Sequence, residues 1–535
     1  MVMTWAGWRA RTRLAVAGLT LGALAAAAPV ADASTLSGRG AAGGPVTGTA
    51  NGPVRGLANG AINEFLGIPY AAPPVGALRW QPPQPAASWS GVRDATRFAP
   101  HCPQSPSPFG QASTSEDCLF LNVFTPRHQH AGSHFPVMVW IHGGALVTGE
   151  SNDYDPTALA EDGVTVVTIN YRLGALGFLA HPALADANGQ SGDYGLMDQQ
   201  AALRWVRCNI ASFGGNPRNV TIFGESAGGL STLSQVASPQ ARGLFERAIV
   251  ESGSYNLTQA PLASAEAAGE AFAAKAGCAG QTAACLRSLP VSTVLANQNA
   301  GGYTPNINSE VLPETLGAAF AAGNFNRVPI INGTNRDEWR LFVALSELRS
   351  GHPLTAANYQ SAISATLGVP PAVAAIIATK YPLAAFPSPS VALGAVGTDA
   401  IFACPALTID KSVSRFVPTF AYEFNDENAP ENFLPPVSFP YGAAHASEIQ
   451  YLMHLPTVAF PGTLSAQQQQ LAMIMKGYWA NFAKRGFPTS FGTPFWPLFN
   501  NLTQGMQSLA PPTPQIETDF ATTHNCAFWT ALEAG

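Results

Sequence analysis

The sequence predicts an α/β protein with a mainly parallel central sheet covered by helices, and two observations indicate this fold class. Strand-like apolar runs alternate with helix-like stretches, without an internal repeat or a convincing linker. Residues 220–230 read as a strand, a turn of small residues and the start of a helix, with Gly224 and Gly228 flanking Ser226 as G-x-S-x-G. Because loops after the strands carry the site in such folds, this turn is the first candidate.

The expected elements follow in order along the chain. Residues 135–141 (FPVMVWI) form a nearly continuous apolar run, as a strand buried on both faces requires. Further strands are expected at 164–169, 220–223, 247–253 (a strand ending in a turn), 328–332 and 419–424. Residues 198–210 predict a helix with Ala202, Trp205, Val206 and Ile210 on one face, ending near Gly214, Gly215 and Pro217.

Composition indicates a packed globular protein. Of the 535 residues, 47% are hydrophobic and 11% are charged, which excludes a disordered chain. With 27 Lys and Arg against 33 Asp and Glu, the net charge is −6. That balance gives no reason to expect nucleic acid as a partner. We expect one catalytic domain over residues 49–535, with long insertions.

The N-terminus reads as an export signal. Arginines at positions 9, 11 and 13 precede an apolar run over 14–28, followed by Ala31-Asp32-Ala33. These features predict a signal peptide over 1–33, cleaved after Ala33. An uncleaved membrane anchor is disfavoured because the run is too short to span comfortably. We therefore expect a secreted, extracellular protein without stable membrane insertion, with residues 34–48 as a flexible leader.

Export makes disulfides permissible. Seven cysteines are present: Cys102, Cys118, Cys208, Cys278, Cys285, Cys404 and Cys526. Six of them could form three bridges, with one left over. Since none lies in a C-x-x-C or similar cluster, no metal site is expected.

Ser226 is the candidate nucleophile. A serine hydroxyl reacts poorly until a base takes its proton, and a third group must orient that base. On this kind of fold the chain order is nucleophile, acid, histidine. The acid and the base are therefore sought downstream of Ser226, at the starts of loops that follow strands.

Longer motifs carry a resemblance to a known family. Residues 116–123 (EDCLFLNV) and 223–229 (FGESAGG) resemble the two signatures of the type-B carboxylesterases, which include cholinesterases, fungal lipases and bacterial para-nitrobenzyl esterases. Similar segments are 65–71 (FLGIPYA), 170–173 (NYRL), 211–217 (ASFGGNP) and 479–483 (WANFA). The chain is closest in character to the secreted bacterial para-nitrobenzyl-type enzymes. The resemblance implies an α/β-hydrolase fold, with long loop and helical insertions over the active site.

The resemblance implies Glu338 as the catalytic acid. This residue ends a segment similar to the family's strand-end motif, residues 333–338 (GTNRDE). Asp337 is the alternative acid. Trp339 stands where the family usually has glycine, so we expect this loop to bend differently.

The family's histidine falls on His445. Residues 442–448 (GAAHASE) match its motif, and His445 alone among the ten histidines has both this motif and a position downstream of Glu338. Glu225, Glu448 and Ser252 also match family positions near the triad. We interpret them as supporting groups or, equally, as ordinary buried hydrogen-bonding residues.

The resemblance implies an oxyanion hole made by the backbone N–H groups of Gly144, Ala145 and Ala227. The family commonly has three glycines after the position of His142, whereas this chain has Gly143-Gly144-Ala145. The N–H group survives the change, but the methyl group of Ala145 narrows the space beside the acyl carbon. Bulky esters, such as those of tertiary alcohols, are therefore expected to be poor substrates.

The cysteines fit the cholinesterase branch of the family. The resemblance implies the bridges Cys102–Cys118, Cys278–Cys285 and Cys404–Cys526. It leaves Cys208, on the predicted helix 198–210, as an inert thiol.

These residues predict a secreted serine carboxylesterase that needs no cofactor and acts on small-molecule esters. Neutral short- to medium-chain or aryl esters are expected, because the loop 102–118 lacks the tryptophan with which cholinesterases hold a quaternary ammonium. A lipase acting at lipid interfaces would differ only in the loops over the site. A catalytically dead binding protein of the same family is the rival from another class, but such members typically lose the nucleophile, and here all three triad positions are filled.

Overall fold

A long, mainly parallel sheet forms the centre of the molecule. The computed structural model describes residues 43–127, 134–299, 302–308 and 310–534. Within these residues, eleven strands pair in the order β16-β15-β14-β13-β10-β9-β7-β8-β6-β4-β3. The strands from β15 to β8 in this order run parallel, and the pairings at both ends are antiparallel. The strand bounds are β3 Leu57–Asn59, β4 Ile62–Pro69, β6 Phe120–Pro126, β7 Phe135–Ile141, β8 Thr165–Ile169, β9 Gly215–Glu225, β10 Arg247–Glu251, β13 Ile330–Asn335, β14 Thr419–Phe424, β15 Met506–Leu509 and β16 Gln515–Glu517.

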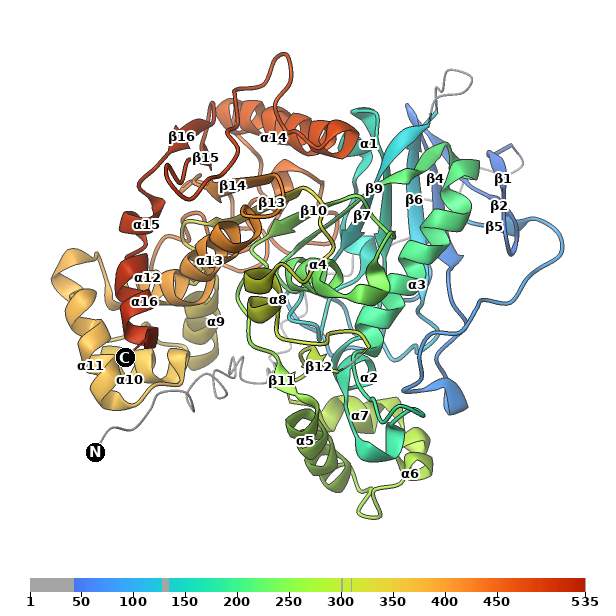
Figure 1. Cartoon of the computed structure of the whole chain (residues 1–535), viewed down its shortest axis with the longest axis horizontal. Coiled ribbons are helices and arrows are strands. Elements are labelled where there is room, and N and C mark those ends of the chain that lie inside the picture. Colours follow the sequence, from blue (N-terminus) through green and yellow to red (C-terminus); the bar gives the residue numbers. More distant parts are fainter. Residues whose placement is uncertain (1–42, 128–133, 300–301, 309, 535) are drawn as a thin grey trace.

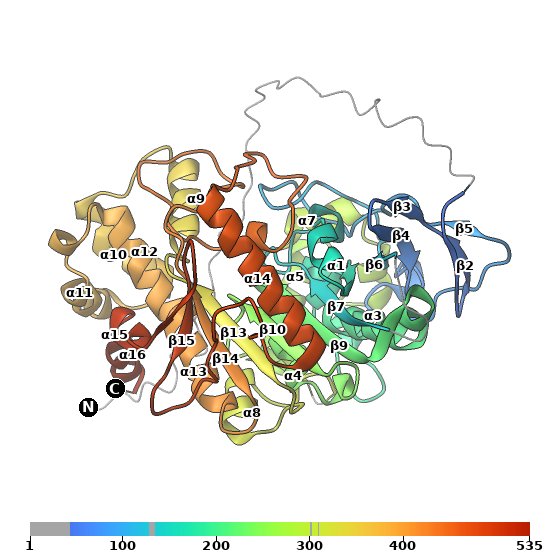
Figure 2. The same cartoon turned by 90° about the horizontal axis from the view of Figure 1, so that it is seen from above.

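Helices cover both faces of this sheet because its central strands are buried on both sides. In β7, Val137, Val139 and Ile141 point into one core, and Met138 and Trp140 point into the other. The first core packs under α3 Tyr194–Asn209, α4 Ala227–Ala237, α8 Leu316–Ala322 and α13 Cys404–Val413. The second packs under α1 Thr157–Glu161 and α14 Ala466–Arg485, and Figure 2 shows α14 lying across the sheet.

Insertions build two further groups of helices beside the sheet (Figure 1). One group comprises α9 Arg340–Ser350, α10 Tyr359–Leu367, α11 Pro371–Lys380 and α12 Pro389–Gly397, and it has an apolar core of its own. The other comprises α5 Leu262–Lys275, α6 Ala283–Ser288 and α7 Val291–Asn297. The remaining elements are β1 Val46–Thr49, β2 Gly52–Arg55, β5 Arg93–Asp94, β11 Ala260–Pro261, β12 Asn306–Ile307, α2 Gly174–Phe178, α15 Phe520–Thr523 and α16 Cys526–Ala534.

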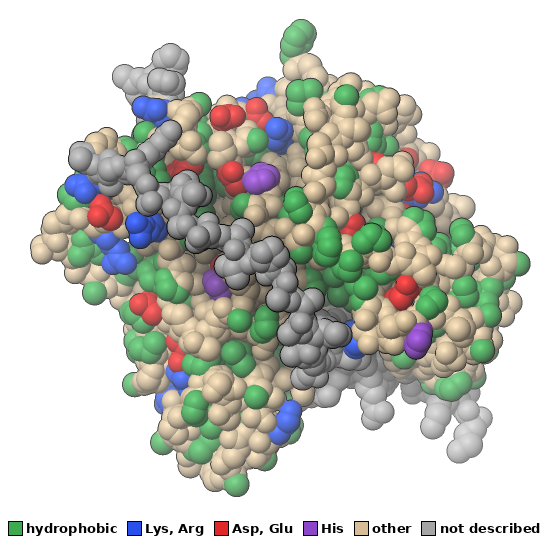
Figure 3. Space-filling model, turned by 180° about the vertical axis from the view of Figure 1, so that it is seen from behind, with side chains coloured by type: hydrophobic (Ala, Val, Ile, Leu, Met, Phe, Trp, Pro, Cys, Tyr) green, Lys and Arg blue, Asp and Glu red, His purple; other side chains and the backbone are tan. Residues whose placement is uncertain are grey.

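Among the described residues, one continuous helix is long and apolar enough to cross a membrane. It spans Pro389–Val413, and 72% of its apolar window is buried inside the fold, as in the core helix of a globular protein. A π-helical turn, Thr398–Ala403, joins its two parts, α12 and α13. On the face shown in Figure 3, charged side chains are scattered among uncharged ones, in keeping with the low charge content.

Several expected boundaries differ from the structure, and one expected segment is not described by it. The predicted signal peptide, residues 1–33, lies outside the described residues. The flexible leader was expected to extend to residue 48, but Val46–Thr49 form strand β1. Val46, Thr47 and Thr49 favour a strand, and β1 pairs antiparallel with Gly52–Arg55. The strand expected at 328–332 is β13, Ile330–Asn335, and the helix expected at 198–210 begins at Tyr194.

The three disulfides implied by the resemblance are confirmed by the structure. Bridges join Cys102 to Cys118, Cys278 to Cys285 and Cys404 to Cys526. Cys208 is a free, exposed thiol on α3.

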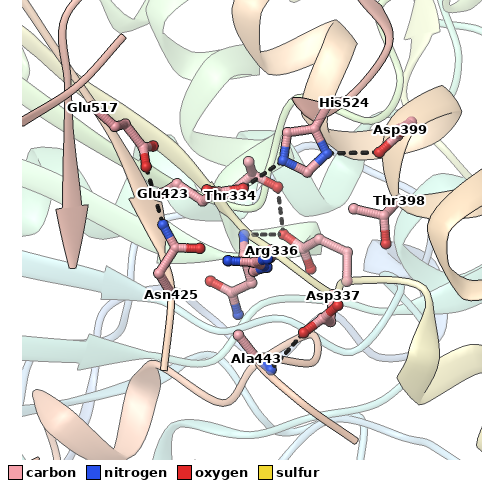
Figure 4. A network of polar contacts seen from close by, with 12 residues as sticks. Thr334, Arg336, Asp337, Thr398, Asp399, Glu423, Asn425, Ala443, Glu517 and His524 are labelled. Carbon is pink, nitrogen blue, oxygen red and sulfur yellow. Dashed lines mark hydrogen bonds and ion pairs between the residues drawn. The ribbon is translucent and has the colours of Figure 1, made fainter. Parts of the chain in front are cut away.

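A buried charged cluster docks the C-terminal segment onto the body (Figure 4). The imidazole of His524 lies between two carboxylates, with Nδ1 2.6 Å from Asp399 and Nε2 2.5 Å from Glu423. Burial alone would lower the pKa of His524, but Glu423 and Asp399 outweigh it and raise that pKa to about 10. His524 is therefore cationic at neutral pH. Its positive charge compensates Asp399, on the π-helical turn, and Glu423, on β14.

Candidate active site

The backbone at Ser226 is forced into a sharp turn between β9 and α4. Its φ of 55° and ψ of −119° lie in a region that residues with a side chain rarely adopt. The flanking glycines are sterically required, since a Cβ atom would lie 2.5 Å from the carbonyl oxygen of Ile141 at Gly224 and 1.9 Å from it at Gly228. The Ser226 N–H donates to the Glu251 carbonyl oxygen at 2.9 Å, which fixes the turn to the neighbouring strand.

His445 and Glu338, the base and the acid that the resemblance implies, lie in contact. The Nδ1 atom of His445 lies 2.5 Å from Oε2 of Glu338, and both side chains are buried. The other carboxylate oxygen of Glu338 accepts hydrogen bonds from the Thr334 hydroxyl at 2.7 Å and from the Asn335 N–H at 2.8 Å. These bonds to the end of β13 hold the carboxylate in one orientation, which in turn orients the imidazole.

The alternative acid, Asp337, faces other partners. One of its oxygens lies 2.8 Å from the Arg340 guanidinium, and the other accepts the Ala443 N–H at 3.0 Å. Trp339 has right-handed helical angles and is the N-cap residue that precedes α9. Its indole fits because residue 397 is glycine, where a Cβ atom would lie 2.1 Å from the ring.

The second nitrogen of His445 lies beside another carboxylate. Nε2 is 3.2 Å from Oε1 of Glu225, and the rings of Phe342 and Phe402 lie 5.2 Å and 5.0 Å from the imidazole. Burial alone would lower the pKa of His445, but Glu225, Glu338 and Glu448 together raise it to about 9. Among the described residues the Ser226 hydroxyl has no hydrogen-bond partner, although Ser226, Glu225 and His445 line the same cavity.

The loop after β7 presents backbone N–H groups to this cavity. Gly144 and Ala145 line it with left-handed φ angles of 96° and 55°. Their N–H groups donate to no other described residue, and Ala227, the first residue of α4, has an N–H group without an intrahelical acceptor. Tyr171 fixes the start of this loop, because its hydroxyl donates to the His142 carbonyl oxygen at 2.7 Å.

The cavity has a volume of about 430 Å³ and a mostly apolar lining. The large apolar side chains that line it are Phe109, Val147, Leu295, Leu341, Phe342, Leu345, Phe433, Ile449, Leu455 and Val458. Asp153 also lines it, but its carboxylate accepts the Thr457 hydroxyl at 2.6 Å, and burial raises its pKa to about 7. Among the described residues, no group of three or more His, Cys, Asp or Glu side chains is arranged to hold a metal ion.

Two features of the site were missed in the sequence. Phe342 and Phe402, which enclose His445, come from the inserted helices and from the π-helical turn, and no local pattern identifies them. Glu251 was placed on a strand but given no role, although a carboxylate in an otherwise apolar strand (RAIVE) was an available signal.

A strained serine turn at the carboxyl end of a parallel sheet, beside a histidine bound to a glutamate, defines the class of α/β-hydrolases. Comparison with known proteins is more specific: the chain belongs to the Carboxylesterase family, whose model matches residues 43–529. It is therefore a carboxylic ester hydrolase.

Three relatives illustrate this similarity. Mouse acylcarnitine hydrolase is 36% identical over 472 residues, and human cocaine esterase is 37% identical over 476; each alignment covers 83% of both chains. Rat pyrethroid hydrolase Ces2e is 36% identical over 473 residues, covering 83% of this chain and 82% of the relative.

Proposed function

We propose that the protein is a secreted serine carboxylesterase in which Ser226, His445 and Glu338 form the catalytic triad. The Ser226 oxygen attacks the ester carbonyl carbon while Nε2 of His445 takes its proton, and Glu338 stabilises the resulting imidazolium. The N–H groups of Gly144, Ala145 and Ala227 stabilise the oxyanion, each contributing roughly 3 kcal/mol to the lowering of the barrier. His445 then protonates the leaving alkoxide, and water hydrolyses the acyl-enzyme by the same route in reverse.

The observation that carries this proposal is the strained Ser226 turn, which opens into the same cavity as a glutamate-bound His445. A serine-reactive phosphonate tests it. Peptide mapping should place the adduct on Ser226 in the native protein and find none in Ser226→Ala. A native protein that hydrolyses esters while an adduct forms at another serine would contradict the triad.

Secretion and the extent of the domain belong to the same proposal. Three disulfides are compatible with a secreted or luminal protein. We propose that residues 1–33 are removed on export and that the remainder folds as a single catalytic domain. Sequencing the N-terminus of the exported protein tests the cleavage site, and a mature protein that retains residues 1–33 would contradict it.

The cavity favours neutral substrates. The tryptophan with which a choline head could stack is absent from the lining side chains of the described residues. Phe109, the one aromatic residue of the Cys102–Cys118 loop, packs against Phe433 with ring centroids 5.4 Å apart. Each exposed cation–π contact gives only about 0.5–1 kcal/mol, and Glu225 is already paired with His445.

We therefore expect neutral short- or medium-chain and aryl esters to be preferred over choline esters. The measurement is kcat/KM for acyl-matched pairs, such as butyrylcholine against a neutral alkyl butyrate, with para-nitrophenyl butyrate as the aryl reference. Neutral esters should react faster. A tenfold advantage for the choline ester would overturn this substrate class.

Replacing Glu225 should change the pH dependence of the reaction. Glu225 lies 3.2 Å from His445 Nε2 and raises its pKa, so Glu225→Gln lowers that pKa. Because deprotonated His445 is the base, the acid limb of kcat/KM should move to lower pH by roughly 0.5–1 unit. The pH profile of para-nitrophenyl acetate hydrolysis measures this shift, with Glu270→Gln on exposed α5 as the charge-matched control. An acid limb that stays in place or moves upward would show that Glu225 does not act on His445.

A further inference from the structure

A row of polar side chains crosses the buried face of the sheet beneath α14. Pairing in register aligns five positions across neighbouring strands: Glu225 on β9, Glu251 on β10, Gly333 on β13, Tyr422 on β14 and Gln507 on β15. Because aligned residues of parallel strands point to the same face, the four side chains of this row lie under α14. The Nε1 atom of Trp479, on α14, donates to Oε1 of Glu251 at 2.8 Å.

This row contains polar atoms that lack partners, although every member is buried. Within the described residues, no hydrogen bond is made by Oε2 of Glu251, the Tyr422 hydroxyl or the side-chain amide of Gln507. Oε1 of Glu448, three residues after His445, is likewise unpartnered. A cluster of buried, unpaired polar atoms is the usual setting for internal water, which typically makes about three hydrogen bonds to such groups.

The absence of a side chain at Gly333 leaves room for the Tyr422 ring on the side of β14 that faces Glu251. A Cβ atom there would lie 2.2 Å from the Tyr422 ring, so this ring occupies the space above Gly333 and leans towards β10. Glu448 faces the same region, with its other oxygen accepting the Asn335 side-chain amide at 2.5 Å. Glu251 interacts electrostatically with both Glu448 and Tyr422, so the three side chains belong to one buried cluster.

Charge counting restricts the protonation of this cluster. Glu225, Glu251, Glu338 and Glu448 are all buried around a single imidazole, that of His445. The other titratable groups that face them are tyrosines: Tyr422, and Tyr154 and Tyr255 beside Glu225. Four ionised carboxylates against one imidazolium would leave three uncompensated buried charges, each costing several kcal/mol. At least one carboxyl group must therefore hold a proton.

We propose that Glu251 is a positioning residue that stays a neutral carboxylic acid and donates a hydrogen bond, through an internal water molecule, to Glu448. Glu251 is well placed for this role, because its Oε1 accepts the Trp479 N–H while its buried Oε2 has no partner among the described residues. The carboxylates in contact with His445 are instead Glu225 and Glu338. Burial, with Glu448 next, raises the pKa of Glu251 to about 8. The donated bond keeps negative charge on Glu448, and Glu448 in turn raises the pKa of His445. This inference rests on the proposed role of His445 as the base.

Two substitutions of Glu251 distinguish a neutral hydrogen-bond donor from an ionised carboxylate at this position. Glu251→Gln is neutral, can still accept from Trp479 and can still donate, so the acid limb of kcat/KM should stay where it is in the native enzyme. Glu251→Leu cannot donate, so Glu448 binds a proton more readily and the acid limb should move to lower pH by about half a unit. Glu225→Gln is the same substitution made beside His445 itself, where it removes a negative charge, and it serves as the shifted reference.

Two outcomes would overturn the proposal. A shift of the acid limb in Glu251→Gln would show that Glu251 is ionised in the native protein. An unshifted acid limb in Glu251→Leu would show that Glu251 does not act on the site. Difference infrared spectroscopy of native protein against Glu251→Gln gives a readout independent of activity and of the leucine variant's folding. The carbonyl band of a protonated carboxylic acid should be present at neutral pH and lost in the variant, and its absence from the native protein would also overturn the proposal. A native protein that hydrolyses no ester would instead refute the proposed function.

Discussion

Replacing Ser226 or His445 with alanine is expected to lower kcat by about 10⁴-fold or more, and the double variant should be little worse than either single one. The residues act as a unit, since a serine without its base and a base without its serine both lose the covalent route. Glu338→Gln should cost roughly 10³–10⁴-fold, because the amide leaves the geometry intact but no longer stabilises the imidazolium. Turnover of para-nitrophenyl butyrate by folded variants measures these losses.

Asp337→Asn is the matched control for the acid. Asp337 is adjacent in sequence, but its carboxylate faces Arg340 and the Ala443 N–H, so kcat should change by less than about tenfold. Near-native turnover in a folded Ser226→Ala protein would refute the triad. A loss in Asp337→Asn that exceeds the loss in Glu338→Gln would transfer the role of the acid to Asp337.

Removing the Cys404–Cys526 bridge is expected to lower the free energy of unfolding by about 4–5 kcal/mol. The two cysteines are 122 residues apart, and cross-linking so long a loop removes much of the entropy of the unfolded chain. Urea unfolding of the native protein and of a Cys404→Ala/Cys526→Ala variant measures the difference.

The Cys278–Cys285 bridge provides the matched comparison. Its cysteines are 7 residues apart, so the same entropy argument predicts a loss of only about 2 kcal/mol for Cys278→Ala/Cys285→Ala. If removing the short bridge costs as much as removing the long one, loop entropy does not govern the stability contributed by the bridges.

The strands were predictable where burial on both faces requires a continuous run of apolar residues. The runs at 135–141 and 419–424 coincide with β7 and β14, since both faces of these strands are buried. Strand β13 was predicted to end three residues too early, because Gly333, Thr334 and Asn335 were assigned to the strand-end motif. These residues pair in register with Tyr422, Glu423 and Phe424. Pairing with β14 outweighs the weak strand propensity of these residues, and a single segment carries no information about its partner.

Residues of the candidate site could be proposed from the sequence where they lie in motifs. Ser226, Glu338 and His445 each follow a strand or occupy a family motif, and the structure brings the latter two into contact. Phe402 could not be found this way, because it reaches His445 from a π-helical turn in an inserted helix. The neighbours of Glu251 come from β9, β13 and β14, which lie beside β10 only in the assembled sheet. The sequence around Glu251 alone therefore could not predict them.

The His524 cluster couples three segments that lie far apart in the sequence. Asp399 and Glu423 are buried, and the imidazolium that compensates them lies 125 and 101 residues further along the chain. A variant cut ahead of His524 would leave both carboxylates without this cation, a defect that costs several kcal/mol. Such a protein would unfold more often and be open to proteases. Cleavage ahead of His524 is therefore expected to shorten the lifetime of the whole enzyme.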